Sequence, residues 1–156
     1  ESNFDAAKEL GNRMVSLDPS YVNGLKILAQ SEFGLGTFDE SLRLADEGAK
    51  KFNNHPMYLT AKMRALRELD RLGDVKRLRD ELFKKQESDL VPAMMLARGE
   101  YYSGNMEGAI AELEQALEDR SIRLIPLDPR KEFEKLNGNP RFDAIWEKLG
   151  LPELKN

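Results

Sequence analysis

The clearest alternation of hydrophobic and polar positions lies between residues 93 and 116, as two consecutive helical patterns. Their apolar faces consist of Ala93, Leu96 and Ala97, followed by Met106, Ala109, Leu113 and Ala116. Residues three and four apart share one face of a helix, and Gly104-Asn105 between the two patterns predicts a turn. The stretch therefore predicts a helical hairpin. Such a hairpin cannot bury both of its faces alone and needs neighbours.

Weaker copies of this hairpin precede it. Asn3-Phe4-Asp5 opens a helical pattern, with Asn3 as the N-cap. Asp18-Pro19 ends this pattern, because the residue before a proline is pushed out of the helical conformation. A second pattern covers residues 22–33 and stops at a Gly-Leu-Gly sequence. Thr37-Phe38-Asp39 then repeats the opening motif, and the two phenylalanines are 34 residues apart.

A third hairpin is expected from Met57 to Arg71 and from Asp74 to Gln86, with its turn at Gly73. This turn lies 37 residues after the glycine at position 36 and 31 residues before the glycine at position 104. Because the two departures from 34 cancel, we interpret them as one lengthened helix or loop followed by a shortened connection, within an unbroken stack.

The interval of 34 residues and the positions of small residues resemble the tetratricopeptide repeat. The matching residues are Leu25, Leu28 and Ala29; Ala93, Leu96 and Ala97; Ala7, Gly11, Met14 and Pro19; and Ala109, Leu113 and Ala116. Glu32 and Glu100 depart from the pattern, since the family has an aromatic residue there. The resemblance implies an all-α fold, a right-handed superhelical stack of antiparallel helical hairpins. An incomplete first repeat and three hairpins would occupy residues 1–120.

The tail, residues 121–156, has a different pattern and is expected to cap the stack. Asn139 at the N-cap and Pro140 at the first helical position predict a short helix. Its apolar stripe consists of Phe142, Ile145, Trp146 and Leu149. Gly150 is the expected C-cap of this helix.

The tail carries a second resemblance. Its residues are Leu127-Asp128-Pro129, Phe133, Leu136, Pro140-Arg141-Phe142 and Leu149-Gly150-Leu151-Pro152. They resemble the C-terminal repeat region of certain bacterial signalling proteins, in which the array follows a winged-helix regulator, a nucleotide cyclase or a kinase. The resemblance implies a sensory or regulatory region. The helical pattern at the first residues is likewise expected of a segment cut from a longer chain.

Composition and charge exclude several classes of function. Twenty-four Lys and Arg against 28 Asp and Glu give a net charge of −4, which argues against a nucleic-acid-binding face. No run approaches the ~18 apolar residues of a membrane span. The absence of Cys excludes disulfides, thiolate catalysis and Cys-based zinc sites. It leaves the compartment undetermined, with the cytoplasm favoured over the periplasm.

No residues with the spacing of a catalytic or metal site stand out. His55, the single histidine, has no partners at ligand spacing and is interpreted as a solvated loop residue. Glu112 and Glu114 point apart on a helix and are interpreted as a solvated face. We therefore expect no catalytic residue, no metal and no cofactor, and predict that the chain is not an enzyme.

A groove for a protein or peptide is the favoured site, because the first helix of each hairpin lines the concave side of a repeat stack. By helical phase, its lining residues are Asn23, Lys26, Gln30, Phe33, Arg64, Arg67, Met94, Arg98 and Tyr101. This polar, cationic and aromatic set suits an extended acidic or C-terminal peptide. The alternatives are that the arginines are solvated and that the pairs Met94-Met95 and Tyr101-Tyr102 lie in the core.

Two functions follow. The first is a non-catalytic protein–protein interaction module that binds a peptide or partner domain in this groove. The alternative is a regulatory region that acts through self-association on an attached output domain. Phe4, Leu10 and Met14 would then form an open apolar face, and we predict weak homodimerisation through it.

Overall fold

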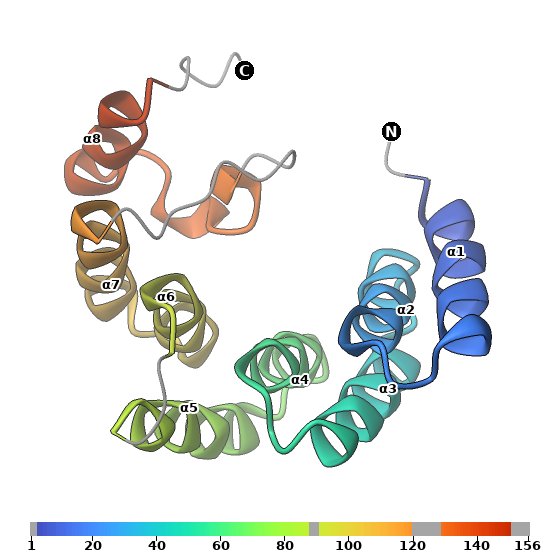
Figure 1. Cartoon of the computed structure of the whole chain (residues 1–156). Helices are drawn as coiled ribbons and strands as arrows, with labels where there is room; N and C mark the ends of the chain where they lie inside the picture. The colour runs from blue at the N-terminus through green and yellow to red at the C-terminus, as the bar shows by residue number, and fades with distance from the viewer. Residues whose placement is uncertain (1–2, 88–90, 120–128, 151–156) are drawn as a thin grey trace. The chain divides into compact units, whose positions relative to one another are not determined.

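Helices form the whole regular structure of residues 3–87, 91–119 and 129–150, which are the residues that the computed structural model describes (Figure 1). In order, the elements are α1 (Phe4–Leu17), α2 (Val22–Gly34), α3 (Phe38–Lys51), α4 (Pro56–Glu68), α5 (Leu72–Gln86), α6 (Ala93–Ser103), α7 (Met106–Glu118), the 3₁₀ helices η1 (Pro129–Lys131) and η2 (Glu134–Leu136), and α8 (Pro140–Lys148). The described residues contain no strand, and the predicted all-α class is confirmed.

The chain divides into two compact units, Glu1–Asp89 with α1 to α5 and Leu90–Asn156 with the remaining elements. Within each unit, α-helices that follow one another along the chain pack in adjacent pairs. The boundary predicted between repeat array and cap, at residues 120 and 121, lies outside the described residues.

Three turns between helices share one backbone geometry. Gly36, Asp70 and Gly104 adopt left-handed φ angles of 80°, 57° and 92°. In each turn the following amide donates to a carbonyl five residues back, at 2.9 Å. The pairs are Thr37 N to Glu32 O, Arg71 N to Leu66 O, and Asn105 N to Glu100 O. This Schellman motif satisfies carbonyls that the end of a helix leaves without partners.

The positions of these turns correct the interpretation of the third hairpin. Its turn is at Asp70, 34 residues from both Gly36 and Gly104, whereas Gly73 lies inside α5. The expected lengthened helix followed by a shortened connection is therefore wrong. The helices α1, α3, α5, α7 and α8 begin at Phe4, Phe38, Leu72, Met106 and Pro140, again at intervals of 34. An aspartate at the turn hid this regularity, because glycine is the usual signal for a left-handed residue.

The predicted N-caps of the first and last helices are confirmed, whereas the C-cap of α8 is Leu149 and not the predicted Gly150. The side chain of Asn3 accepts a backbone N–H three residues on, at 3.0 Å, and Asn139 accepts one two residues on, at 3.0 Å. Gly150, with a φ of 70°, follows the end of α8. Three residues of the predicted apolar stripe are buried, and the fourth, Leu149, is half-buried.

Tyr58 joins three helices in the core of the first unit. The residue is fully buried, and its hydroxyl donates to the carbonyl of Val22 at the start of α2. A Cβ at Gly48 on α3 would overlap the Tyr58 ring, so the glycine permits this close approach. Phe52 stacks on the same ring, with centroids 5.6 Å apart. Burial raises the pKa of Tyr58 to about 12, and the side chain therefore stays a neutral donor.

The turn geometry predicts opposite effects for two alanine substitutions in the first unit. Gly36→Ala should lower the free energy of unfolding by about 1–2 kcal/mol, because alanine disfavours the left-handed conformation. A Cβ there meets no atom within 4 Å, so the backbone alone causes the loss. Gly73→Ala should raise the free energy of unfolding by roughly 0.5–1 kcal/mol, since this glycine lies in a helix. Urea unfolding followed by helical circular dichroism measures both. The reverse order would place the turn at Gly73.

Candidate functional site

The helices α2 and α4 carry six of the predicted groove residues and pack against each other directly. The guanidinium of Arg64 lies over the ring of Phe33, 3.8 Å from its centroid. The other four residues are Asn23, Lys26, Gln30 and Arg67, and we call the set of six the α2–α4 face. Gln30 is exposed and the other five are half-buried, so solvent reaches each of them. The fold thus brings together side chains from two different hairpins, as a groove requires.

Positive charge gathers near one end of this face. His55 is exposed, as predicted, and its Nδ1 accepts the N–H of Met57 at 3.3 Å, which caps the first turn of α4. The imidazole of His55 is partly covered by neighbouring atoms, and this partial desolvation lowers its pKa; the positive charges of Lys85 and Lys26 lower the pKa further. Lys26 belongs to the α2–α4 face. The imidazole of His55 is therefore a reporter of the charge there, and an anionic ligand beside Lys26 would raise its pKa.

Replacing Lys26 with Gln should raise the pKa of His55 toward its ordinary value of about 6.5, because one charge that disfavours the imidazolium is removed. NMR titration measures this without ambiguity, since the chain has a single histidine. Lys62→Gln is the matched control, because Lys62 pairs with Asp46 at 2.6 Å and is not among the charges that shift His55. An equal shift in both variants would contradict a local effect of Lys26.

The same shift sets the direction of the pH dependence of stability. The neutral imidazole caps α4, and the folded state disfavours its protonation. The stability that His55 contributes is therefore present above a pH of about 6.5 and is lost as the pH falls through the lowered pKa.

The remaining three predicted groove residues lie in the second unit and are largely withdrawn from solvent. Met94 and Tyr101 are buried, and Arg98 is half-buried. The ring of Tyr101 lies edge-on to Phe133, with centroids 5.0 Å apart. Its hydroxyl oxygen accepts the backbone N–H of Lys135 at 3.4 Å. Burial of both tyrosines at positions 101 and 102 agrees with the alternative that this pair lies in the core.

Arg98 forms a two-pronged ion pair with Glu132. Its Nε donates to Oε1 at 2.9 Å and its Nη2 to Oε2 at 2.8 Å. The hydroxyl of Tyr102 donates to the same carboxylate. The two charged side chains are only 19% and 21% exposed. Burial works against the charge of Arg98, but the Glu132 carboxylate outweighs this effect and raises the pKa of Arg98.

Glu132 was missed as a partner of Arg98 by the sequence reasoning. The signal was present, because the two residues are 34 positions apart, the same interval that separates the helix starts.

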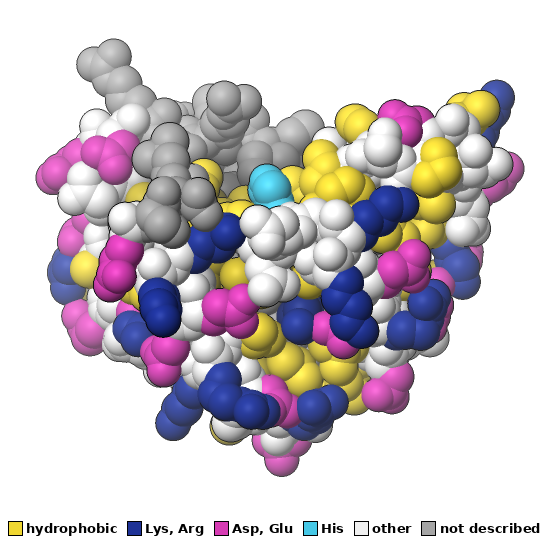
Figure 2. Space-filling view, turned by 60° about the horizontal axis from the view of Figure 1, so that its bottom comes forward, with side chains coloured by type: hydrophobic (Ala, Val, Ile, Leu, Met, Phe, Trp, Pro, Cys, Tyr) yellow, Lys and Arg dark blue, Asp and Glu magenta, His cyan; other side chains and the backbone are white. Residues whose placement is uncertain are grey.

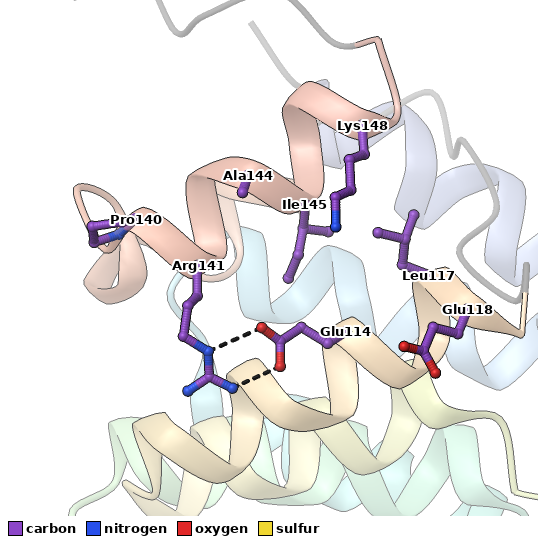
Figure 3. Close-up of a pocket in the computed structure, with 8 residues that line it drawn as sticks. All are labelled: Glu114, Leu117, Glu118, Pro140, Arg141, Ala144, Ile145 and Lys148. Carbon is purple, nitrogen blue, oxygen red and sulfur yellow. Dashed lines mark hydrogen bonds and ion pairs between the residues drawn. The ribbon is translucent and has the colours of Figure 1, made fainter.

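A shallow hollow of about 390 Å³ lies between α7 and α8 in the second unit (Figure 3). The guanidinium of Arg141 closes one end by donating to both oxygens of Glu114, at 2.9 and 2.6 Å. Glu107 also pairs with Arg141, at 2.9 Å. None of the predicted site residues lines this hollow.

A second hollow of about 410 Å³ lies among α3, α4 and α5 of the first unit. Lys62 and Asp46 pair within it at 2.6 Å, and Asp74 pairs with Arg71 and Arg77. These opposite charges balance one another within the hollow.

On the side of the molecule drawn in Figure 2, cationic and anionic side chains are interspersed, so neither sign of charge dominates the visible surface.

Among the described residues, no group of three or more His, Asp or Glu side chains is placed to hold a metal ion. Within the same ranges, no helix has the length and apolar character that crossing a bilayer requires. No family model, curated protein or solved structure matches this chain.

Proposed function

We propose that the chain is a non-catalytic protein-interaction module that binds an acidic peptide segment across the α2–α4 face. The observation that carries the proposal is the guanidinium of Arg64 stacked on Phe33 at the solvent-accessible surface between two hairpins. Stacking uses the flat face of the guanidinium, and its N–H groups lie in its plane, a geometry suited to carboxylates. Lys26 and Arg67 add positive charge on the same face.

The fold belonging to this proposal is a right-handed stack like that of tetratricopeptide repeats. The equal intervals of 34 between turns and between helix starts support it. In such a stack the first helices of successive hairpins lie along one side. The direct packing of α2 against α4 agrees with this arrangement within the first unit.

Reversing two charges of the α2–α4 face should greatly weaken the binding of an acidic partner. For Arg64→Glu/Arg67→Glu we expect the affinity to fall by at least about 100-fold, because each of two lost hydrogen bonds to a charged group contributes about 1.5–3 kcal/mol. An affinity pull-down from a lysate of the source organism identifies proteins that the wild-type chain retains. Titration calorimetry with the recovered partner then measures the loss.

The matched control is Arg13→Glu/Lys76→Glu, which makes the same change in net charge at exposed positions outside the face. Partners retained by the wild type and by this control, but not by the Arg64/Arg67 variant, would support the proposal. Equal retention by all three proteins would rule out the α2–α4 face as the binding site.

A regulatory region that acts through self-association is the second candidate, and exposed leucines on α1 favour it. Leu10 and Leu17 are 51% and 78% exposed, an apolar pair seven residues apart on one helix. Of the other residues predicted for self-association, Met14 is half-buried. Phe4 is half-buried as well and packs against Gly34, where a Cβ would overlap its ring. The proposed contact between copies of the chain is therefore centred on Leu10 and Leu17. In this second proposal, self-association through that contact would regulate an attached output domain.

Leu10→Lys/Leu17→Lys should convert any dimer to monomer, because two charges would then have to be buried at the contact. Sedimentation velocity at several concentrations measures the change. Leu35→Lys/Leu72→Lys serves as the control, since these leucines are also exposed, at 39% and 47%, but lie outside α1. A dimer unaffected by the α1 variant would place the contact elsewhere.

A further inference from the structure

The segment before the turn at Gly138, which leads into α8, differs from the segments before the turns at Gly36, Asp70 and Gly104. Gly138 has a left-handed φ of 84° and lies 34 residues after Gly104. A full helix precedes each earlier turn, whereas here the preceding elements are η1 and η2, of three residues each. Such short 3₁₀ turns supply few backbone hydrogen bonds of their own. The position of residues 130–136 therefore depends on side-chain contacts with the rest of the unit.

Three residues of this segment, Glu132, Phe133 and Leu136, pack against the rest of the unit or are buried in it. The carboxylate of Glu132 receives both prongs of Arg98 and the hydroxyl of Tyr102. Phe133, fully buried, lies edge-on to Tyr101. Leu136, which follows one turn later, is 3% exposed. Glu132, Phe133 and Leu136 thus hold the segment in the manner of a bound peptide, and the buried Arg130 and the contact of Phe133 with Phe142 of α8 add to this.

The charged contact is more than an apolar cap requires. Partial burial of an ion pair removes hydration from both partners, and apolar side chains in the same place would often be as stable. Such a pair provides selectivity, because a two-pronged guanidinium binds a carboxylate more tightly than it binds a neutral or basic residue in the same place. Arg98, Tyr101 and Tyr102, all on α6, therefore form a recognition surface for a defined short sequence.

We infer that this surface of α6 is a docking site for a partner peptide with a Glu-aromatic-x-x-Leu sequence, and that residues 132–136 occupy it in cis. The chain's own Glu132, Phe133 and Leu136 display that chemistry. An incoming peptide must displace them, so its apparent affinity is the intrinsic affinity multiplied by the fraction of molecules in which the site is free. The inference rests on the proposed function only in assigning peptide binding to this chain, since it concerns residues outside the α2–α4 face.

The test uses a fluorescent peptide with the sequence of residues 129–137 and the whole chain. In Glu132→Gln/Phe133→Ala, the cis contacts are weakened, and we expect the peptide to bind about 10- to 100-fold tighter than to the wild type. Fluorescence anisotropy measures both affinities. Adding Arg98→Gln to this variant should remove the gain. A peptide with the same two substitutions should bind neither protein.

The milder variant Glu132→Gln keeps the buried phenylalanine and provides the measurement if the double variant does not fold, as judged by circular dichroism. Peptide binding no tighter than to the wild type, in a folded variant, would overturn the inference. A gain that survives Arg98→Gln would overturn it as well. Neither result bears on the α2–α4 face, because Arg64 and Arg67 are unchanged in every protein of this test.

Discussion

The left-handed turn at the end of a helix is the constraint on which the packing of the hairpins depends. Gly36, Asp70 and Gly104 each reverse the chain so that the next residue has two roles. Its amide closes the Schellman motif of one helix, and the same residue is the N-cap of the next. The end of one helix and the start of the following one are therefore coupled. This coupling turns the apolar faces of the two helices toward each other.

Two buried carboxylates lie next to these turns. Glu32 and Glu100 are 5% and 4% exposed. Glu32 pairs with Lys8 at 2.6 Å and accepts the hydroxyl of Thr37 at 2.5 Å, and these two contacts lower its pKa. Glu100 accepts the side-chain N–H of Asn105 at 2.9 Å. Each carboxylate thus accepts a hydrogen bond from the residue after the turn, and Glu32 also pairs with Lys8 of α1, which offsets the cost of burying them.

The two units use cationic and aromatic side chains in different ways. In the first unit, Arg64 stacks on Phe33 in a setting that solvent reaches. In the second, Arg98 and its neighbouring tyrosines face Glu132 and Phe133 of the tail, largely out of water. The Coulomb attraction between a carboxylate and a guanidinium is stronger in such a setting than at an open surface, because the surrounding dielectric is lower, although both groups lose hydration there. An arginine beside an aromatic ring is therefore accessible to solvent in the first unit, whereas in the second unit residues of the tail cover the arginine and its neighbouring tyrosines.

Local pattern determined much of the fold. The all-α class, the caps at Asn3 and Asn139 and the turns at Gly36 and Gly104 could be predicted from sequence alone, because capping, glycine conformation and helical periodicity act within a few residues. The turn at Asp70 could not, since its left-handed conformation depends on the helices on either side. The candidate site divides in the same way. Helical phase selected Phe33 and Arg64, and the structure brings them together. Only tertiary structure decided that Arg98 is paired with Glu132, because that contact joins residues distant in sequence through the packing of the segment of short 3₁₀ helices on α6.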